Sequence, residues 1–526
     1  MDYDINQFLE AVKSIENKAR QEGRLIENPN VDSLRALTAI QPDVRETLYG
    51  SLTFDSEPNS RAAKHTKNSI DDKFGETEDG LLEKMAERLA KEKLVLLDRQ
   101  IGGSDGAVSR LIVPLGFVKI AYAGGKLFGS VTKTQSPDDY IIFFHDDEFE
   151  KNKTKKLPDK DITIRLAMFP DGKTIKVIRN SDYIGEYKKG NFAAEEWRTK
   201  QKTPGIFLHA GCRTDYLEDV EGSYGEVSSL LIALSANGKT STTCRVLARK
   251  EKEISWLVQD DGGTLMPDSS FRGFEAGGIF VKTEGVCPEN QIETYYGLLK
   301  KQTAMENVFV DESGNPDFFN FTKTSNGRAV IRRKDFMHAS PWINAPKIDN
   351  MILITRGPII PAISKLSREQ AVALMILGQA MQSSAGDPTQ AGKLINEFFY
   401  DPFFVGDKAE HAHRFYGIME NNPQMNFYLL NTGGVGENEK YNKITLNSTM
   451  NILDSLIRGG LTHWKESPSG FYVPAAVRNL SDRFFHPEKL YSPEEYNQRQ
   501  ATLDHNRRDI LESIQGLDAK IKNVFE

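Results

Sequence analysis

Residues 230–240 read Leu-Leu-Ile-Ala-Leu-Ser-Ala-Asn-Gly-Lys-Thr, an apolar run of strand character that ends in a turn of small residues. A strand that leads into a Gly-Lys-Thr turn is the pattern of a phosphate-binding loop. Consecutive backbone N–H groups surround an anion there, the lysine reaches the β- and γ-phosphates, and the threonine hydroxyl ligates Mg²⁺. The segment predicts a nucleotide site, although Ala233 stands where the pattern has its first glycine and Gly-Lys-Thr also occurs in ordinary turns. The candidate nucleotide-binding residues of this loop are Ser235, Ala236, Asn237, Gly238, Lys239, Thr240 and Ser241.

The bulk composition indicates a large globular protein. The chain has 526 residues, of which 39% are hydrophobic and 27% charged, and its formal net charge is −7. This length suffices for two to four domains with sizeable cores. The mild acidity argues against a general nucleic-acid binder, which would carry an excess of basic residues.

The cysteine pattern and the hydropathy indicate a cytoplasmic protein. Cys212, Cys244 and Cys287 are widely spaced and form no Cys-x-x-Cys pair, which is typical of a reducing compartment without a disulfide framework or a thiolate zinc site. The acidic N-terminus lacks the basic region and apolar core of a signal peptide. No apolar run approaches the roughly 20 residues that span a bilayer. We therefore expect a cytoplasmic location and no membrane or nucleic-acid partner.

Hydrophobic periodicity predicts an α/β protein that divides into two domains near residue 225. Helices are expected over residues 5–22, 81–94, 366–384, 448–458 and 492–524. Strands are expected over residues 110–113, 140–144, 162–166, 230–235, 243–248 and 254–259. Residues 54–80 and the charged run 151–160 are expected to form loops.

Two clusters before the loop carry nitrogen groups that suit metal chemistry. Lys188 and Lys189 are adjacent, and their mutual repulsion lowers the pKa of either amine, so that a neutral amine can ligate a metal ion. A solvated charged turn is the alternative for this pair. His209 ends the apolar run Phe207-Leu208-His209, where it is either a metal ligand or a hydrogen-bonded core residue.

Two further clusters follow the loop. Asp260 and Asp261 end an apolar strand downstream of the phosphate loop, which is where a Mg²⁺ or Mn²⁺ ligand is expected. Arg328 follows a turn, where a guanidinium can clamp a carboxylate or phosphate with two hydrogen bonds. A solvated carboxylate pair and a surface arginine are the respective alternatives.

Taken in order, these clusters resemble the ATP-type phosphoenolpyruvate carboxykinase family. That family has a Tyr-Gly-Gly-Glu-Met-Lys-Lys-Gly segment, then a metal-binding histidine, a Gly-Leu-Ser-Gly-Thr-Gly-Lys-Thr-Thr loop and a Gly-Asp-Asp segment, and residues 183–190 here are similar to the first of these. Further similar segments are residues 275–283, 306–311, 324–328, 429–433 and 491–495. The resemblance covers residues from about 160 to 526 and depends on the shared order of the motifs.

The resemblance implies a two-lobed α/β fold with mixed sheets and a P-loop in the C-terminal lobe. Residues 1–225 would form an N-terminal substrate-binding lobe, with residues 1–100 as a divergent cap. Residues 226–526 would form the C-terminal nucleotide-binding lobe. The implied cofactors are ATP, Mg²⁺ and Mn²⁺, and the implied partners are the nucleotide and a small-molecule substrate.

The resemblance also implies a role for each matching position. Lys189, His209 and Asp261 would ligate Mn²⁺, to which nitrogen ligands are better suited than to Mg²⁺. Thr240 would ligate the Mg²⁺ that accompanies ATP, Asp260 would orient the water shell of this ion, and Lys239 would stabilise the transferring phosphoryl group. Tyr183, Lys188, Ser235 and Arg328 would surround the second substrate and the phosphoryl group. Lys443 and Thr449 would lie near the adenine, where Lys443 replaces an arginine of the family and so loses its planar stacking surface.

In such an enzyme oxaloacetate loses CO₂ to give an enolate, whose oxygen attacks the γ-phosphorus of ATP. The Mn²⁺ would stabilise the enolate oxygen as a Lewis acid, and both cations and Lys239 would neutralise the charge that develops on the phosphoryl group.

The departures from the family pattern leave three hypotheses open. Gly103 stands where the family has an arginine that grips the organic acid, and Arg99 or Arg110 is the candidate substitute. Ala236 brings a Cβ into a loop position that is crowded if it needs a positive φ. The chain is thus a divergent carboxykinase, a kinase of the same fold acting on another small molecule or a protein hydroxyl, or a nucleotide-binding regulator without turnover. Retention of Lys189, His209 and Asp261 weighs against the regulator.

Overall fold

The computed structural model describes residues 3–56, 65–132, 135–147, 149, 162–234, 237–323, 326–381 and 393–526. The chain forms two compact units. Unit 1 comprises residues 1–203 and 274–337, and unit 2 comprises residues 204–273 and 338–526. Both units combine helices with mixed sheets, which confirms the α/β class. The division into a substrate-binding lobe of residues 1–225 and a nucleotide-binding lobe of residues 226–526 stays a prediction. It places residues 274–337 in the second lobe, whereas these residues belong to unit 1.

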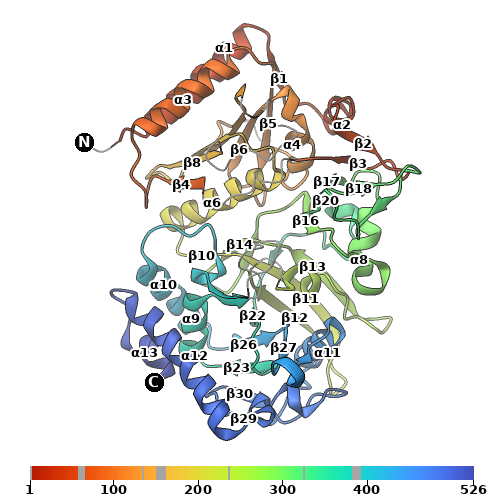
Figure 1. Cartoon of the computed structure of the whole chain (residues 1–526), viewed down its shortest axis with the longest axis vertical. Coiled ribbons are helices and arrows are strands. Elements are labelled where there is room, and N and C mark those ends of the chain that lie inside the picture. Colours follow the sequence, from red (N-terminus) through yellow and green to blue (C-terminus); the bar gives the residue numbers. More distant parts are fainter. Residues whose placement is uncertain are drawn as a thin grey trace. The chain divides into compact units, whose positions relative to one another are not determined.

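Unit 1 contains a seven-stranded sheet in the order β1-β5-β6-β7-β9-β8-β4 and a five-stranded sheet in the order β16-β20-β17-β3-β2 (Figure 1). Its strands are β1 (Leu25–Glu27), β2 (Val44–Glu46), β3 (Leu52–Phe54), β4 (Thr66–Asn68), β5 (Leu94–Gln100), β6 (Val108–Pro114), β7 (Asp139–Phe144), β8 (Thr163–Met168), β9 (Thr174–Arg179), β16 (Gly278–Lys282), β17 (Ala304–Glu306), β18 (Phe309–Val310), β19 (Pro316–Asp317) and β20 (Arg328–Arg332).

The helices of unit 1 cover its sheets. They are α1 (Asn6–Gln21), α2 (Val31–Ala39), α3 (Glu76–Leu89), α4 (Val118–Gly124), α6 (Ile184–Lys202) and α8 (Pro288–Leu298). In α1, Phe8, Val12 and Ile15 recur at helical spacing and pack in one cluster with α3 and with β6 and β7. Helix α6 lies close to β7, since a Cβ at Gly190 would stand 2.7 Å from the Ile141 side chain.

Unit 2 contains an eight-stranded sheet in the order β13-β11-β12-β22-β26-β23-β30-β29 and a four-stranded sheet in the order β10-β14-β15-β21. Its strands are β10 (Ile206–Leu208), β11 (Ala210–Glu218), β12 (Tyr224–Ile232), β13 (Ile254–Gln259), β14 (Gly263–Leu265), β15 (Phe271–Gly273), β21 (Asn344–Ala345), β22 (Asn350–Thr355), β23 (Ile363–Leu366), β24 (Gln379–Met381), β25 (Leu394–Asn396), β26 (Asn426–Asn431), β27 (Gly434–Val435), β28 (Asn442–Lys443), β29 (Trp464–Glu466) and β30 (Tyr472–Pro474). Its helices are α7 (Lys239–Thr243), α9 (Arg368–Leu377), α10 (Lys408–Asn421), α11 (Leu446–Ile457), α12 (Pro493–Ser513) and α13 (Ala519–Lys522).

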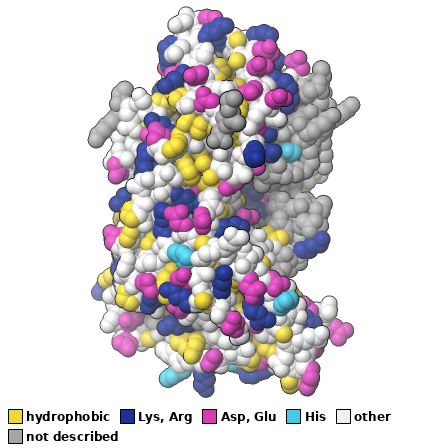
Figure 2. Space-filling view, turned by 90° about the vertical axis from the view of Figure 1, so that its left-hand side faces the viewer, with side chains coloured by type: hydrophobic (Ala, Val, Ile, Leu, Met, Phe, Trp, Pro, Cys, Tyr) yellow, Lys and Arg dark blue, Asp and Glu magenta, His cyan; other side chains and the backbone are white. Residues whose placement is uncertain are grey.

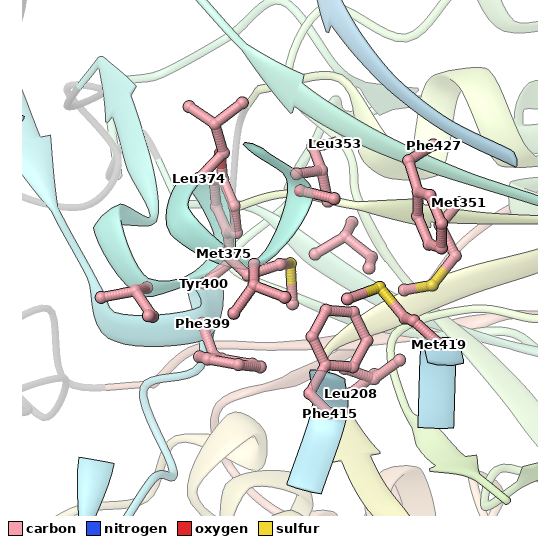
Figure 3. Packing of buried hydrophobic residues seen from close by; sticks show 14 of the residues in the cluster. Leu208, Met351, Leu353, Leu374, Met375, Phe399, Tyr400, Phe415, Met419 and Phe427 are labelled. Carbon is pink, nitrogen blue, oxygen red and sulfur yellow. The ribbon is translucent and has the colours of Figure 1, made fainter. Parts of the chain in front are cut away.

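The central strands β12, β22 and β26 run parallel to one another, and β22, most of β26 and the second half of β12 are buried. Alternate side chains of the buried stretches enter two different hydrophobic clusters, which explains why each strand contains a continuous apolar run. Figure 3 shows one of these clusters, in which Met351 and Leu353 of β22 pack with Leu374 of α9 and Phe415 of α10. This rigid centre positions the segments that follow β12 and β13.

Most of the predicted elements are present, and several have different ends. The strands expected within residues 110–166 correspond to β6, β7 and β8, and the helices expected at 5–22 and 448–458 correspond to α1 and α11. The helix expected over 366–384 ends at Leu377, because Gly378 has a φ of +47° and β24 begins at Gln379. The C-terminal helix ends at Ser513, shortly before Gly516 with a φ of +78°, and α13 follows.

Three predicted elements are wrong in part. Residues 243–248 do not form a strand, because Thr242 and Thr243 belong to α7 and their hydroxyls donate to the carbonyls of Gly238 and Lys239. The helix expected over 81–94 begins at Glu76 and ends at Leu89, where β5 follows. The described part of the expected loop 54–80 therefore contains β4 and the first turn of α3. The charged run 151–160 lies outside the described residues.

The surface carries charges of both signs, and Figure 2 shows Lys and Arg side chains interspersed with Asp and Glu on one face of the molecule. Within the described ranges, each helix is too short or too polar to cross a bilayer.

Candidate active site

The residues Lys239 and Thr240 begin a short helix that follows a buried strand. Strand β12 ends at Ile232 and helix α7 starts at Lys239. Gly238 precedes the helix with a φ of +93°, a left-handed conformation that glycine adopts without the steric cost of a Cβ. Ser235 and Ala236 lie outside the described residues, so the expectation about a crowded Cβ at Ala236 stays a prediction. The strand and the helix thus stand in the order that a phosphate-binding loop requires.

Helix α7 is held against strand β11 by close packing and by a buried arginine. A Cβ at Gly211 would stand 2.4 Å from the Thr243 hydroxyl, so only glycine permits this approach. Arg213 donates from Nη1 to the carbonyl of Thr242 at 2.8 Å and forms a two-pronged ion pair with Asp215 at 2.7 Å. Both charged side chains are fully buried. Arg213 was not predicted from the sequence, although an arginine and an aspartate two positions apart on a strand lie on the same face.

We expect Arg213→Met to destabilise unit 2 by about 3–5 kcal/mol, because the substitution leaves the Asp215 carboxylate buried without its partner. Urea unfolding followed by circular dichroism measures the loss. The double variant Arg213→Met/Asp215→Asn removes both charges and should recover a large part of the stability. Equal destabilisation of the single and double variants would show that the ion pair has no such role.

Two aspartates follow strand β13 at the edge of the sheet where β12 ends. Strands β12 and β13 both run antiparallel to β11, so their carboxyl ends lie on the same side of the sheet. Lys239 Nζ lies 2.7 Å from Asp261 Oδ1, and Thr240 Oγ1 lies 3.3 Å from both carboxylate oxygens of Asp260. Asp261 has a φ of +87°, a strained conformation of the kind that clusters at ligand sites. The structure thus brings the predicted phosphate and metal residues of unit 2 together.

His209 completes this group from the segment between β10 and β11. Its Nδ1 lies 3.1 Å from the carbonyl of Tyr400, and its Nε2 lies 3.7 Å from Asp261 Oδ1. Because a carbonyl only accepts hydrogen bonds, Nδ1 carries a proton, which leaves Nε2 as the nitrogen that would ligate a metal ion beside Asp261. This is the arrangement of a metal-ligating histidine, whose second nitrogen is fixed by a backbone carbonyl.

The donor set of unit 2 fits a divalent transition-metal ion with one more protein ligand. Within the described ranges, no group of three or more histidine, cysteine, aspartate or glutamate side chains could hold a metal ion. That His209 and Asp261 are metal ligands stays a prediction, and the resemblance assigns the third ligand of the predicted Mn²⁺ site to Lys189. An imidazole, a carboxylate and an amine suit Mn²⁺.

Residues 183–188 are buried, and residues from Ile184 onward belong to helix α6, which excludes a solvated turn for this segment. Tyr183 is the N-cap of α6, and Lys188 Nζ lies 3.1 Å from Glu275 Oε1 and over the rings of Phe192 and Phe280. Lys189 is partly exposed, and its Nζ lies 2.8 Å from Glu186 Oε1. A carboxylate beside an amine favours the charged ammonium, so binding of a metal by Lys189 requires release of a proton.

The Glu186 carboxyl is expected to make the stability of unit 1 fall at acidic pH. Burial raises the pKa of this carboxyl, but Lys176 and Lys189 outweigh burial and lower it to about 2. A carboxyl with a lowered pKa in the folded state stabilises the fold above its unfolded pKa of about 4.5 and loses that contribution as pH falls toward 2. We expect the melting temperature of Glu186→Gln to fall less steeply than that of the parent between pH 5 and pH 3. Differential scanning calorimetry at several pH values measures this, and parallel curves would contradict it.

The predicted arginines of unit 1 have different surroundings. Arg328 starts β20, where Nη1 donates to the carbonyl of Gly327 and lies 3.6 Å from Glu284 Oε1. Arg110 on β6 is engaged by Asp98 through two hydrogen bonds and by Glu16 through a third, all at 2.8 Å. This structural ion-pair cluster disfavours Arg110 as the substitute that binds an organic acid, because two carboxylates already accept three of its five N–H groups. Arg99 donates to the carbonyls of Gly125 and Asp98.

The expected adenine residues belong to unit 2. Lys443 lies exposed on β28, and Thr449 is buried in α11. A nearby contact was not predicted from the residue types alone: Thr432 Oγ1 donates to the carbonyl of Asn237 at 2.8 Å and thereby ties the phosphate loop to the end of β26. In the sequence, Thr432 is indicated only by the whole Asn431-Thr432-Gly433 motif.

Ser241, a predicted residue of the phosphate loop, belongs to α7.

Comparison with known proteins gives a consistent result. The family model described as phosphoenolpyruvate carboxykinase, of the ATP type, matches residues 64–483. A protein of Aeropyrum pernix named phosphoenolpyruvate carboxykinase (ATP) is 29% identical over 344 residues, which cover 64% of this chain and 67% of that protein. Proteins of the same name from Campylobacter jejuni subsp. doylei and Allorhizobium ampelinum are 25% and 26% identical and are covered over 63% and 57% of their length. The aligned part of the chain thus spans about two thirds or less of these relatives.

The family match includes β12, α7 and β13, with the residues that surround Lys239. The motif order, the α/β sheets and the matched family model agree, and the chain belongs to the ATP-type phosphoenolpyruvate carboxykinase family.

Proposed function

We propose that the protein converts oxaloacetate and ATP to phosphoenolpyruvate, ADP and CO₂. The observation that supports this best is the meeting of Lys239, His209 and Asp261 at one edge of the sheet of unit 2, in a chain of this family. Lys239 and His209 both face the carboxylate of Asp261. The lysine expected to bind phosphate and the residues expected to bind the metal ion therefore lie at the same point of the sheet edge.

The proposed reaction breaks the bond between the C4 carboxylate and C3 of oxaloacetate. The electron pair of that bond forms the enolate, CO₂ leaves, and the enolate oxygen attacks the γ-phosphorus as ADP departs. Lys189, His209 and Asp261 would hold a Mn²⁺, which would supply Lewis-acid stabilisation of the enolate charge, and Thr240 would hold the Mg²⁺ that accompanies ATP.

The side chains of this chain contribute position and charge. Lys239 turns from Asp261 to the γ-phosphoryl group and neutralises the charge that develops during transfer. Thr240 and Asp260 already face each other and would position the nucleotide ion and its water shell. Tyr183, Lys188 and Arg328 would bind the organic acid, and Lys443 and Thr449 would contact the adenine.

A cytoplasmic location belongs to the same proposal. All three cysteines are free thiols, which is typical of a reducing compartment.

A kinase of the same fold with a different acceptor is the second candidate. It is favoured by the loss of the family arginine at Gly103 together with the engagement of Arg110 by Asp98 and Glu16. A coupled assay of ADP formation with ATP, Mg²⁺ and Mn²⁺ tests both candidates, with oxaloacetate compared against a panel of hydroxyl acceptors. ADP formation that requires oxaloacetate supports the carboxykinase, and formation with another acceptor alone supports the kinase. Nucleotide binding without ADP formation would instead support a regulator.

A further inference from the structure

Unit 1 contains a cluster of basic side chains outside the residues discussed so far. Arg35 lies on α2, Tyr122 on α4, Lys126 just beyond the C-terminal end of α4, and Arg332 at the end of β20. Helices α2 and α4 lie against each other in Figure 1. We call these four residues the basic cluster.

Lys126 brings an amine into the buried part of this cluster. The residue is 6% exposed, its Nζ lies 3.3 Å from the centre of the Tyr122 ring, and it donates to the carbonyl of Gln302 at 2.8 Å. Burial lowers the pKa of this amine well below its usual value, and the charges of Arg332 and Arg35 lower it further. The negative charge of Asp335 acts in the opposite direction and raises the pKa of Lys126.

The two arginines are each paired with one carboxylate. Arg35 Nη2 lies 2.7 Å from Glu46, and Arg332 Nε lies 2.6 Å from Asp335. Two arginines therefore face two carboxylates while Lys126 is neutral, and uptake of a proton by Lys126 gives the basic cluster an excess of one positive charge.

The basic cluster also holds hydrogen-bond donors that the protein does not use. Tyr122 is 1% exposed, and within the described ranges its hydroxyl proton has no acceptor in hydrogen-bonding geometry, while the Arg35 guanidinium, which can only donate, faces the hydroxyl oxygen. Arg35 Nε likewise has no acceptor in hydrogen-bonding geometry. Burial raises the pKa of the Tyr122 hydroxyl to about 12, so it remains a donor at physiological pH. Unused buried donors are costly unless a ligand or water accepts from them.

We infer that Arg35, Tyr122, Lys126 and Arg332 form a binding site for a small oxyanion such as phosphate, sulfate or a carboxylate. An oxyanion accepts from the unused donors and neutralises the excess charge, which a water molecule cannot do. The side chains of Arg35 and Arg332 are 19% and 25% exposed, so the cluster is reached from solvent. The site is separate from the proposed reaction and does not depend on it.

The location suggests what the anion does. Arg332 is the last residue of β20, the strand that begins with Arg328. An anion that fixes Arg332 therefore stabilises the strand that carries a predicted substrate residue.

The test compares thermal unfolding in sodium sulfate, sodium phosphate and sodium malonate with unfolding in sodium chloride at equal ionic strength. At about ten times the dissociation constant the oxyanion should raise the melting temperature of the parent by ~3 °C. Lys126→Met should abolish this shift, and Arg332→Gln, a milder change at a partly exposed position, should reduce it. Lys173→Met, which removes an exposed lysine of the same unit, should keep it.

A phosphate loop also binds oxyanions, so Lys239→Met separates the two sites. The inference requires that the shift persists in Lys239→Met and is absent in Lys126→Met. The opposite pattern would place the anion at the phosphate loop and overturn the inference. Equal melting temperatures in chloride and in all three oxyanions would also overturn it, because water would then satisfy the donors. A response to malonate alone identifies a carboxylate site, and a response to sulfate and phosphate identifies a tetrahedral oxyanion site.

Proton uptake gives a second, independent readout. Because the pKa of Lys126 is lowered in the empty cluster, an anion that binds beside the amine raises it and draws a proton from solution. Affinity should therefore fall as pH rises from 6 to 8. Calorimetric titration with sulfate in two buffers of different ionisation enthalpy measures the uptake, which should vanish in Lys126→Met. Binding without any proton uptake in the parent would contradict the assigned role of the amine.

Discussion

Lys239→Met should lower kcat/KM for ATP-dependent turnover by about 10³-fold. Methionine keeps the length of the side chain but removes the one charge that the phosphate loop places beside Asp261. The lysine side chain is only 4% exposed, so its charge acts in surroundings where water screens it weakly. Removal of a preorganised charge from a transferring group costs on the order of 10²–10³ in rate, and the lysine is also needed to bind the triphosphate.

A matched control separates this loss from a general effect of removing a lysine. Lys347→Met removes an exposed lysine of the same unit that is paired with Asp349, and it should leave turnover unchanged. Steady-state kinetics of the parent and of both variants, at saturating Mg²⁺ and Mn²⁺, give the comparison. Turnover of Lys239→Met within threefold of the parent would refute the placement of the phosphate loop.

Asp261→Asn should lower kcat/KM by about 10²-fold and weaken Mn²⁺ binding by a similar factor. The asparagine is of the same size, but its neutral oxygen is a poorer ligand for a cation, and it no longer offsets the charge of Lys239. His209 faces the same carboxylate from 3.7 Å, so both ligands of unit 2 are affected by the substitution.

Electron paramagnetic resonance of free Mn²⁺ measures the binding without any dependence on turnover. Asp268→Asn is the control, since Asp268 is an exposed aspartate of unit 2 that caps the turn at Ser270. We expect its Mn²⁺ titration to match that of the parent. Unchanged Mn²⁺ affinity in Asp261→Asn would remove Asp261 from the metal site and leave its contact with Lys239 as a structural ion pair.

The elements predicted correctly are those that a short stretch of sequence encodes by its own hydrophobic pattern. Each central strand contains a continuous apolar run because alternate side chains enter two clusters, and this run is visible without a structure. The predicted residues Lys239, Thr240, Asp260 and Asp261 lie together because parallel strand ends share one edge of the sheet. The strand expected at 243–248 failed because β-branched residues joined a helix that begins after Gly238.

The sequence could not predict which charged side chains are already engaged. Arg110 was a candidate for binding an organic acid, but its partner Glu16 lies in α1, far away along the chain. The carbonyl of Tyr400 that fixes the proton on His209 is equally remote, and so is Glu275 beside Lys188. Such pairs depend on the packing of distant elements, which no local pattern encodes.

The central claim is that Lys189, His209 and Asp261 bind one Mn²⁺ beside a bound triphosphate. Crystals grown with Mn²⁺ and ATP, measured at an energy where manganese scatters anomalously, test it most directly. The account predicts one anomalous peak within bonding distance of Lys189 Nζ, His209 Nε2 and an Asp261 carboxylate oxygen, next to the γ-phosphate. A peak bound by other side chains, with Lys189 Nζ still beside Glu186, would contradict it.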